Sequence, residues 1–293
     1  MPNKFDCYKK QIKKNMLIYY IYGKKRLIMK YYEQMLGYTY DFDNPKTFTE
    51  KLNTRKASNN KLLKKCADKV MVREYVKDKI GAEYLIPEYF VTNRLTKKLY
   101  KKMPNQCVLK TASGSGTVEI IFDKSKMNMK ETLKLMREYQ KVKFHYIWGE
   151  MFYKGIKNKI ICEKLLLTKD GKVPIDIKVH CFRNGGGKPK YFIQLDIDRF
   201  GDHRRNYYDE NFKLLDIQEL HPNYDKKVEK PKNWNEILTV AKKLSEDFDY
   251  VRVDLYSFED KVYFGELTFS HNAGFSVFNP PKWNKLFGKY WKS

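Results

Sequence analysis

The chain has 293 residues, enough for one large domain or for two lobes with an apolar core. Hydrophobic residues make up 42% and aromatic residues 15% of the chain, which excludes an intrinsically disordered protein. Lys and Arg outnumber Asp and Glu by 59 to 35, so the formal net charge is +24. A field of this sign attracts anions, whether nucleotides, nucleic acid, acidic glycans or an anionic membrane face.

The five cysteines are an odd number and contain no CxxC pair, so the sequence suggests neither a disulfide framework nor a zinc knuckle. We therefore expect a reduced, cytosolic setting. The first apolar run, residues 16–23, is too short to cross a bilayer and lies between lysine clusters. It fits a basic amphipathic helix on the inner membrane face, or a buried helix with a lysine-rich solvent side, and we favour the buried helix.

Residues 1 to about 60 are predicted to be helical. Within them, Thr47 followed by Glu50 has the spacing of a capping box, which marks a helix start. The next predicted helix covers residues 67–81 and is closed by Gly81. The following elements are strands and one amphipathic helix: strands at 84–91, 107–110 and 118–122, and the helix at 127–143.

The chain becomes β-rich from Lys159. Strands are predicted at 159–167, 174–184 and 189–200, separated by hairpin turn signals at 169–172 (Lys169, Asp170, Gly171 and Lys172) and at 185–187. A helix at 234–248 precedes a last hairpin formed by 250–258 and 261–269. This order of elements predicts an α+β protein with two lobes and no doubly wound sheet.

The last hairpin carries the strongest chemical signal. If its loop has three residues, 259–261, then Phe258 faces Val262 and Asp254 lies directly opposite Glu266. Like charges in that position repel, and a divalent cation between them removes the repulsion, with oxygen ligands that suit Mg²⁺. The alternative is an exposed hairpin with solvated charges. A two-residue loop would place the carboxylates on opposite faces.

Three weaker patterns precede this hairpin. Lys110 ends a buried strand and opens a small Gly-Ser loop that can present N–H groups to phosphates, although no GK[ST] closes it as in a Walker A motif; it could equally be an ordinary hairpin loop. Glu163 and Lys164 interrupt an apolar strand, which can leave backbone groups free for an adenine edge or simply mark a crossing to the surface. Lys178 belongs to a polar strand face that suits phosphate neutralisation, or only faces solvent.

Taken in order, these patterns resemble the teichuronopeptide-biosynthesis (TupA-like) branch of the ATP-grasp superfamily. The resemblance runs from Ala67 to Gly274 through ADKVMVREYV, YLIP, CVLKTASGSG, DIKVHCF, VRVDLY and YFGELTFSHNAG, and NPKTFTEKLN just upstream is typical of the same branch. It implies an ATP-grasp fold, with ATP held between the antiparallel sheets of two α/β lobes. The boundaries that follow are a helical segment at 1–62, a small lobe at 63–166 and a large lobe with the metal site at 167–293.

The resemblance also implies roles for individual residues. For ATP, these are two lysines, a loop over the phosphates and an adenine hinge: Lys69 and Lys110; Ser113, Gly114, Ser115 and Gly116; Glu163, Lys164 and Leu166. For the reaction, they are a lysine on the terminal phosphate, an arginine on the transferred phosphoryl group and the Mg²⁺ ligands: Lys178; Arg252; Asp254 and Glu266.

The sequence departs from the family pattern at two points. Thr268 stands where the family usually has an Asn metal ligand, which puts a second metal ion in doubt. About 60 helical residues also stand where carboxylate–amine ligases have an N-terminal α/β domain.

The expected function is that of an ATP- and Mg²⁺-dependent enzyme of surface polysaccharide biosynthesis. A carboxylate–amine ligase would join an amino acid or amine to an acidic sugar through an acyl phosphate. The arginines of the loop at 198–207, which are Arg199, Arg204 and Arg205, are candidates for the acceptor carboxylate, because Arg pairs with carboxylate in a bidentate way; the alternative is a plain surface loop. Two other functions stay open: a glycan kinase, and a non-catalytic binder of polyanions, of which nucleic acid is the less expected.

Overall fold

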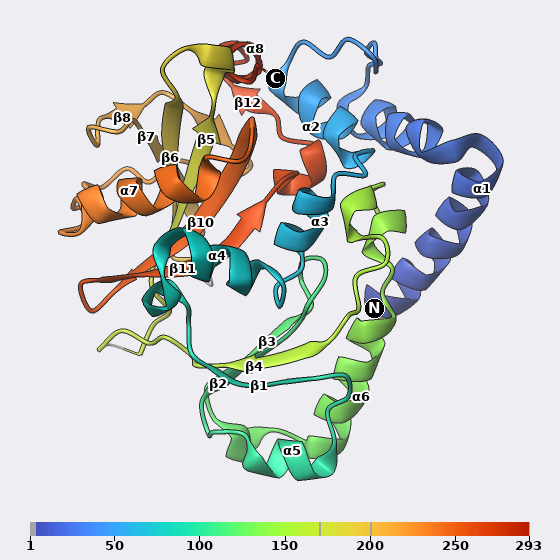
Figure 1. Cartoon of the computed structure of the whole chain (residues 1–293), viewed down its shortest axis with the longest axis vertical. Coiled ribbons are helices and arrows are strands. Elements are labelled where there is room, and N and C mark those ends of the chain that lie inside the picture. Colours follow the sequence, from blue (N-terminus) through green and yellow to red (C-terminus); the bar gives the residue numbers. More distant parts are fainter. Residues whose placement is uncertain (1–3, 170, 200, 293) are drawn as a thin grey trace. The chain divides into compact units, whose positions relative to one another are not determined.

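A computed structural model of the chain describes residues 4–169, 171–199 and 201–292, and side chains from residue 8 onward (Figure 1). Asp170 of the predicted turn and Phe200 of the arginine-rich loop lie outside the described residues. The chain divides into two compact units. The first unit holds residues 1–31, 56–73 and 86–166, and the second holds residues 32–55, 74–85 and 167–293.

The N-terminal part is helical, as predicted. It forms α1 (Lys4–Leu36), which is interrupted at Gly23 by a positive φ of 77°, then α2 (Phe48–Lys56) and α3 (Lys61–Ala67). The capping box is confirmed at the start of α2. The Thr47 N–H donates to Glu50 Oε2 at 3.1 Å, and the Glu50 N–H donates to Thr47 Oγ1 at 3.4 Å.

The first unit contains a four-stranded antiparallel sheet in the order β1-β4-β2-β3. Its strands are β1 (Glu88–Thr92), β2 (Cys107–Thr111), β3 (Val118–Ile121) and β4 (Ile160–Glu163). The helices α5 (Lys97–Lys102) and α6 (Met129–Lys141) pack their apolar sides into one core with Leu109 and Cys162 of the sheet. Short 3-10 turns complete the unit: η2 (Lys124–Lys126), η3 (Phe144–Tyr146) and η4 (Met151–Tyr153).

The second unit is built on a six-stranded antiparallel sheet in the order β11-β10-β5-β6-β7-β8. Its strands are β5 (Asp176–Phe182), β6 (Lys190–Ile197), β7 (Arg204–Tyr208), β8 (Leu214–Leu215), β10 (Tyr250–Phe258) and β11 (Lys261–Thr268). A small ladder pairs β9 (Gln218–Glu219) with β12 (Phe278–Asn279). The other elements are α4 (Val72–Ile80), η1 (Ala82–Tyr84), η5 (Asn184–Gly186), α7 (Trp234–Ser245), η6 (His271–Gly274) and α8 (Lys282–Tyr290).

An aromatic cluster forms the core on one side of this sheet. Phe48 of α2 is fully buried and its ring lies 5.0 Å from that of Tyr250 and 5.6 Å from those of Phe182 and Phe287. Helix α7 packs against β5 and β10 (Figure 1). The N-terminal helix α2 and the C-terminal helix α8 therefore share one core with the middle strands of the sheet, which makes the strand positions of β5 and β10 rigid.

The helix predicted for residues 67–81 is shorter than predicted. It ends at Gly81 as predicted, where the Gly81 N–H donates to Lys77 O, but it begins only at Val72. The reason is Asp68, whose side chain accepts from the Val70 and Met71 N–H groups and ends the preceding helix in a turn.

The turn signal at 169–172 does not join two neighbouring strands. A local turn is present, because the Thr168 N–H donates to Lys172 O at 2.8 Å. However, β4 belongs to the four-stranded sheet and β5 to the six-stranded sheet, so this connection leads from one sheet to the other. The glycines at 185–187 do join the antiparallel pair β5 and β6, as predicted.

The apolar run at 16–23 is not the buried helix that we favoured. Leu17, Tyr20 and Ile21 are 62%, 71% and 57% exposed, while Asn15 is buried and donates to Tyr146 O and Ile147 O. In this stretch α1 contacts the first unit through Asn15 and turns Leu17, Tyr20 and Ile21 outward, whereas Leu27 and Ile28 further along the helix are buried. Among the described helices, none combines the length and apolar character needed to cross a membrane.

Candidate functional site

The hairpin of β10 and β11 has a tighter turn than predicted. Phe258 pairs with Lys261, so the loop consists of Glu259 and Asp260 alone. Both loop residues have positive φ angles, 51° and 57°, which is the backbone of a two-residue turn matched to the twist of the strands. The three-residue loop that supported our register argument is therefore wrong.

A bulge in β11 restores the register that the short loop would have lost. Leu255 pairs with Phe264, and the next pair is Asp254 with Glu266, so Gly265 is an extra residue. A Cβ at Gly265 would lie 3.0 Å from the Asp254 carbonyl oxygen, which explains why the bulge holds a glycine. Asp254 and Glu266 consequently lie opposite each other, as predicted, but for a different physical reason.

The predicted reaction residues form rows across three neighbouring strands. Asp254 pairs with Glu266 of β11 on one side and with Lys178 of β5 on the other. In the adjacent row, Arg252 pairs with Thr268 on β11. One stretch of the six-stranded sheet thus brings together Lys178, Arg252, Asp254, Glu266 and Thr268.

Arg252 and Asp254 form a buried bidentate pair. Arg252 Nε lies 2.7 Å from Asp254 Oδ1, and Arg252 Nη2 lies 2.6 Å from Asp254 Oδ2. Arg252 Nη2 also donates to Thr268 Oγ1 at 3.2 Å and lies 3.8 Å from Glu266 Oε1. Burial nevertheless raises the pKa of Asp254 to about 6, and the Glu266 carboxylate adds to the rise, against the lowering effect of Arg252.

This arrangement fits a divalent cation held partly by a ligand. Asp254, Glu266 and Thr268 offer two carboxylates and one hydroxyl, which are the oxygen donors that Mg²⁺ takes. Among the residues that the structure describes, no group of three or more His, Cys, Asp or Glu side chains forms a complete metal cage. A site with only two carboxylates is typical of Mg²⁺ that is bound together with substrate phosphates.

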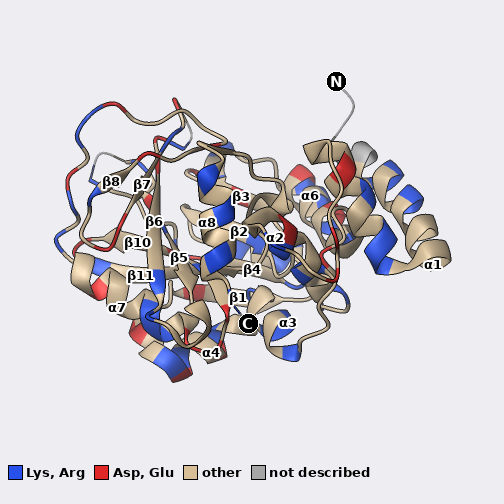
Figure 2. Ribbon diagram, turned by 90° about the horizontal axis from the view of Figure 1, so that it is seen from above, with Lys and Arg blue, Asp and Glu red and all other residues tan. Residues whose placement is uncertain are grey.

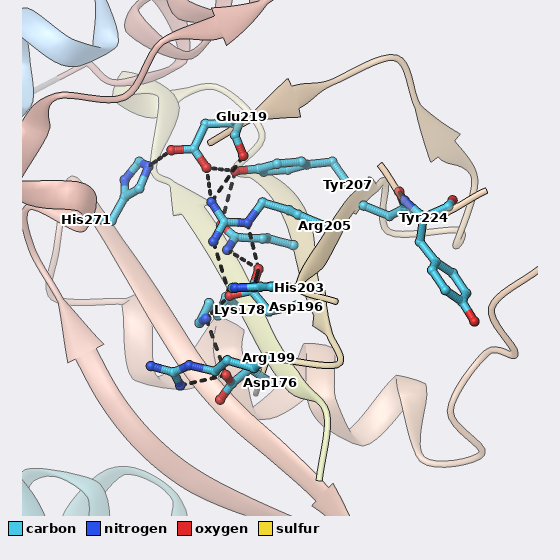
Figure 3. A network of polar contacts seen from close by, with 12 residues as sticks. Asp176, Lys178, Asp196, Arg199, His203, Arg205, Tyr207, Glu219, Tyr224 and His271 are labelled. Carbon is cyan, nitrogen blue, oxygen red and sulfur yellow. Dashed lines mark hydrogen bonds and ion pairs between the residues drawn. The ribbon is translucent and has the colours of Figure 1, made fainter. Parts of the chain in front are cut away.

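Lys178 belongs to a buried network of charges that includes Asp196, Arg205 and Glu219 (Figure 3). Its Nζ forms an ion pair with Asp196 and lies 3.6 Å from Asp176 Oδ2. Arg205 bridges the other end, with Nε 2.6 Å from Asp196 Oδ1 and Nη1 on the Glu219 carboxylate. Burial alone would raise the pKa of Asp196, but Lys178 and Arg205 hold it well below its usual range.

The network continues to two buried histidines. His271 Nε2 lies 3.8 Å from Glu219 Oε1, and His180 hydrogen-bonds to Gln194 Oε1 and to the Tyr250 hydroxyl. Burial lowers the pKa of both histidines. His180 is therefore a packed core residue, and its partners fix the strand that carries Lys178.

The three arginines proposed for the acceptor lie in different environments. Arg205 is buried, and all three of its nitrogen atoms contact Asp196 or Glu219. Arg204 pairs with the exposed Asp202 at 2.8 Å. Arg199 has a side chain that is 52% exposed and lies 2.8 Å from Asp176 Oδ2, so it alone of the three joins the buried network to the surface.

Among the candidate ATP residues of the first unit, Lys110 lies on β2, Glu163 on β4 and Lys69 in the turn after α3, beside the Gly-Ser loop (residues 113–116). Lys110 Nζ forms an ion pair with Glu163 Oε1 on the neighbouring strand β4. Lys69 Nζ donates to Gly114 O at 2.6 Å, and the Lys69 N–H donates to Ala112 O at 2.9 Å. Lys69, Lys110 and Glu163 thus lie on elements that are directly tied to one another.

The Gly-Ser loop is anchored by a hydrogen bond at its first residue and contains two glycines with positive φ. The Ser113 N–H donates to Asn158 Oδ1 at 3.0 Å, and Gly114 and Gly116 have φ angles of 79° and 71°. At the opposite end of β4, the Lys164 N–H donates to Pro87 O at 2.9 Å, and Leu166 is buried. The Lys164 N–H is therefore already bonded within the protein.

Sequence reasoning missed Asp196 and Glu219. A signal for Asp196 existed, because Gln194 and Asp196 alternate with apolar residues on β6 and could have been matched with the polar face of β5. Glu219 lies on a strand of two residues and carries no comparable signal.

The sequence matches one family model. The model of the TupA-like ATP-grasp family covers residues 50–292, which is most of the chain. Among curated proteins, no sequence matches the chain.

Solved structures with similar folds include two D-alanine–D-alanine ligases and one synthetase. The Helicobacter pylori ligase is 11% identical with a TM-score of 0.45, over 78% of this chain and 61% of that one. The Bacillus anthracis ligase is 16% identical with a TM-score of 0.42, over 77% and 64%. N5-carboxyaminoimidazole ribonucleotide synthetase from Thermus thermophilus is 13% identical with a TM-score of 0.41, over 73% and 48%. The chain spans less than two thirds of the length of each.

Proposed function

The chain belongs to the TupA-like ATP-grasp family and has the α+β ATP-grasp fold, and from this premise we propose that it is an ATP- and Mg²⁺-dependent carboxylate–amine ligase. Its substrates would be an acidic sugar of a surface polysaccharide and the amine of an amino acid. The observation that carries the proposal is the opposition of Asp254 and Glu266 beside Lys178 and Arg252. Two carboxylates and two cations on neighbouring strands, three of them buried and Glu266 open to solvent, suit a magnesium–triphosphate group.

The candidate ATP residues of the first unit fall into three groups. In the first unit, Lys69 and Lys110 would neutralise phosphate charge, the Gly-Ser loop would cover the phosphates, and the hinge of Glu163, Lys164 and Leu166 would meet the adenine. The Lys110–Glu163 ion pair supports this, because it holds the lysine on β2 without burying it completely. The hinge at Lys164 would have to use groups other than its N–H, which Pro87 already engages.

In the second unit, Asp254 and Glu266 would hold Mg²⁺, with Thr268 as a weaker third ligand. The bound ion would neutralise charge on the phosphates as the terminal phosphoryl group leaves. Arg252 would then turn part of its guanidinium from Asp254 to the transferred group, and Lys178 would approach the terminal phosphate. The bidentate contact places Arg252 on the same face of the sheet as Asp254, and phosphate binding would require Arg252 to release part of this contact and Lys178 to move from Asp196.

The proposed reaction has two steps. A carboxylate oxygen of the sugar attacks the terminal phosphorus of ATP, the bond to the bridging oxygen breaks, and ADP leaves. The amine then attacks the carbonyl carbon of the acyl phosphate, the bond from that carbon to the phosphate oxygen breaks, and inorganic phosphate leaves while the nitrogen gives up a proton to solvent and the amide forms. Arg199 is the arginine that we propose for the acceptor carboxylate, since Arg205 is fully engaged with Asp196 and Glu219.

A coupled assay for ADP and phosphate tests this proposal. A ligase releases phosphate only when uronic acid, an amine and Mg-ATP are all present. ADP release with a neutral glycan and no amine would instead identify a glycan kinase. Absence of any thermal stabilisation by Mg-ATP would contradict both and favour a polyanion binder.

We also propose that α1 rests on an anionic membrane face. Leu17, Tyr20 and Ile21 are spaced three and four residues apart and share one exposed side of the helix. Lys and Arg recur along α1 on both sides of this patch (Figure 2). Exposed apolar side chains between cations are typical of helices that lie in the membrane interface, and such a contact would bring the enzyme to a membrane-bound glycan.

A further inference from the structure

A strongly basic surface pocket lies in the first unit, apart from the candidate ATP residues. Its volume is about 460 Å³, within the range of small-molecule sites. Five cations and three amides line it, and no carboxylate does: Arg94, Arg137, Lys141, Lys157 and Lys159; Asn93, Gln140 and Asn158.

The floor of this pocket is fixed by hydrogen bonds between three chain segments. Gln140 Nε2 donates to Asn93 O at 2.9 Å and to Asn158 O at 2.8 Å. Asn158 Nδ2 donates back to Tyr139 O at 3.2 Å and to Gln140 O at 3.3 Å. The end of β1, the end of α6 and the segment before β4 are therefore locked together, and the cations project from a rigid base.

The same floor holds the Gly-Ser loop. Asn158 Oδ1 accepts from the Ser113 N–H at 3.0 Å, and Lys159 O accepts from the Ala112 N–H at 2.9 Å. Asn158 and Lys159 thus line the pocket and also anchor the segment that leads into the loop.

The charges of the pocket are only slightly compensated. Lys141 lies 2.8 Å from Glu138 Oε1, and Lys9 lies 3.4 Å from the other oxygen of the same carboxylate. An exposed pair of this kind stabilises by little and yields easily to a better anion. Arg94, Arg137 and Lys157 are exposed, so they can reach a ligand without a change of fold.

We propose that this pocket binds a carboxylate-bearing oligosaccharide and so holds the acidic glycan acceptor on the first unit. The identity of the ligand as acceptor rests on the proposed function, whereas the binding of an acidic oligosaccharide does not. Several cations spread over one pocket suit a chain with repeated charges better than a single anion. Single-stranded nucleic acid is disfavoured, because the lining offers no aromatic ring on which bases could stack.

The test measures binding of tetragalacturonate to the full chain by calorimetry, with a neutral oligosaccharide of equal length, inorganic phosphate and a short single-stranded RNA as comparisons. The pocket variant is Arg137→Gln with Lys157→Gln. The matched control is Lys130→Gln with Lys134→Gln, which removes the same charge from exposed positions, both of them on α6, outside the pocket lining. We expect the pocket variant to bind tetragalacturonate about tenfold more weakly and the control less than about twofold, because two exposed ion contacts are lost only in the former.

Four results would overturn the proposal. They are equal weakening in the control, equal binding of the neutral oligosaccharide, phosphate binding as tight as that of tetragalacturonate, and tighter binding of the RNA. Thermal stabilisation by Mg-ATP separates this proposal from the proposed function. If the pocket variant loses tetragalacturonate but keeps the Mg-ATP shift, the pocket is supported independently. If the wild type shows no Mg-ATP shift yet binds tetragalacturonate in the pocket, only the enzymatic function fails.

Discussion

Replacing Asp254 with asparagine should stabilise the protein while abolishing its response to Mg-ATP. The pKa of Asp254 is raised from 3.8 to about 6, so the fold disfavours the ionised form more than the unfolded chain does. Because the pKa of Asp254 is higher in the folded state than in the unfolded chain, the stability that the protonated carboxyl contributes is fully present below about pH 4. This stability is lost as the pH rises through 6. At about 1.4 kcal/mol per pKa unit, ionisation costs the folded state about 3 kcal/mol at pH 8.

Asparagine resembles the protonated carboxyl, and Glu266 Oε1, 3.8 Å from Arg252 Nη2, remains as a partner for the arginine, so Asp254→Asn should raise the free energy of unfolding by up to about 3 kcal/mol at pH 8. The gain should fall to about half at pH 5 and vanish below pH 4, where both side chains are neutral. Urea unfolding at these pH values measures it. In a thermal shift assay at a hundred times the dissociation constant, Mg-ATP should stabilise the wild type by about 2.7 kcal/mol and the variant by nothing measurable.

Asp196→Asn is the matched control, because it neutralises a second buried aspartate of the same sheet whose pKa is shifted in the opposite direction. Its pKa is lowered by Lys178 and Arg205, so neutralising it at pH 8 should destabilise the protein by about 3–5 kcal/mol. The reasoning is refuted if Asp254→Asn is less stable than the wild type at pH 8. A full Mg-ATP shift in that variant would show that Asp254 does not ligate the metal.

Three further outcomes follow from the geometry. Gly265→Val should disturb the bulge, because its Cβ would lie 3.0 Å from a backbone oxygen of β10, and should weaken Mg-ATP binding at least about tenfold in equilibrium dialysis; unchanged affinity would contradict the register argument. Lys110→Met should lose ATP binding and destabilise the fold by about 3 kcal/mol, since Glu163 stays buried without its cation; unaltered stability in urea would contradict the role of this pair. Leu17→Glu should reduce sedimentation with anionic vesicles, whereas Leu214→Glu, also at an exposed leucine, should not; equal loss in both would exclude a specific patch.

Periodicity and turn signals predicted most of the fold, because they report local backbone preference. The strands around Lys110, Lys178 and Asp254 and the helices α6 and α7 lie where the pattern placed them. The prediction that the turn at 169–172 joins two neighbouring strands was wrong for a physical reason. Its residues do favour a turn, but their local backbone preference does not determine which sheet the following strand joins. Tertiary packing decides which sheet the strand joins, and local sequence patterns do not report tertiary packing.

The opposition of Asp254 and Glu266 was predicted from a loop length that proved wrong. Two departures from regular structure compensate each other: a loop one residue shorter and a bulge one residue longer. The sequence did not indicate a two-residue turn at Glu259 and Asp260, because the residues that adopt positive φ in such a turn are usually Gly and Asn. Gly265 was a signal that could have been used, because an isolated glycine inside a strand pattern often marks a bulge.

The two buried aspartates of the second unit differ in how far the protein compensates their negative charge. Asp196 lies between Lys178 and Arg205, and its negative charge is satisfied by the protein alone. Asp254 has one bidentate arginine but also faces Glu266, and the balance leaves its carboxylate destabilised. Both are buried on the strands that flank β5, so burial does not explain the difference; the number of cations does. An added divalent cation would therefore stabilise the fold more at Asp254 than at Asp196, which is the property that a Mg-ATP site requires.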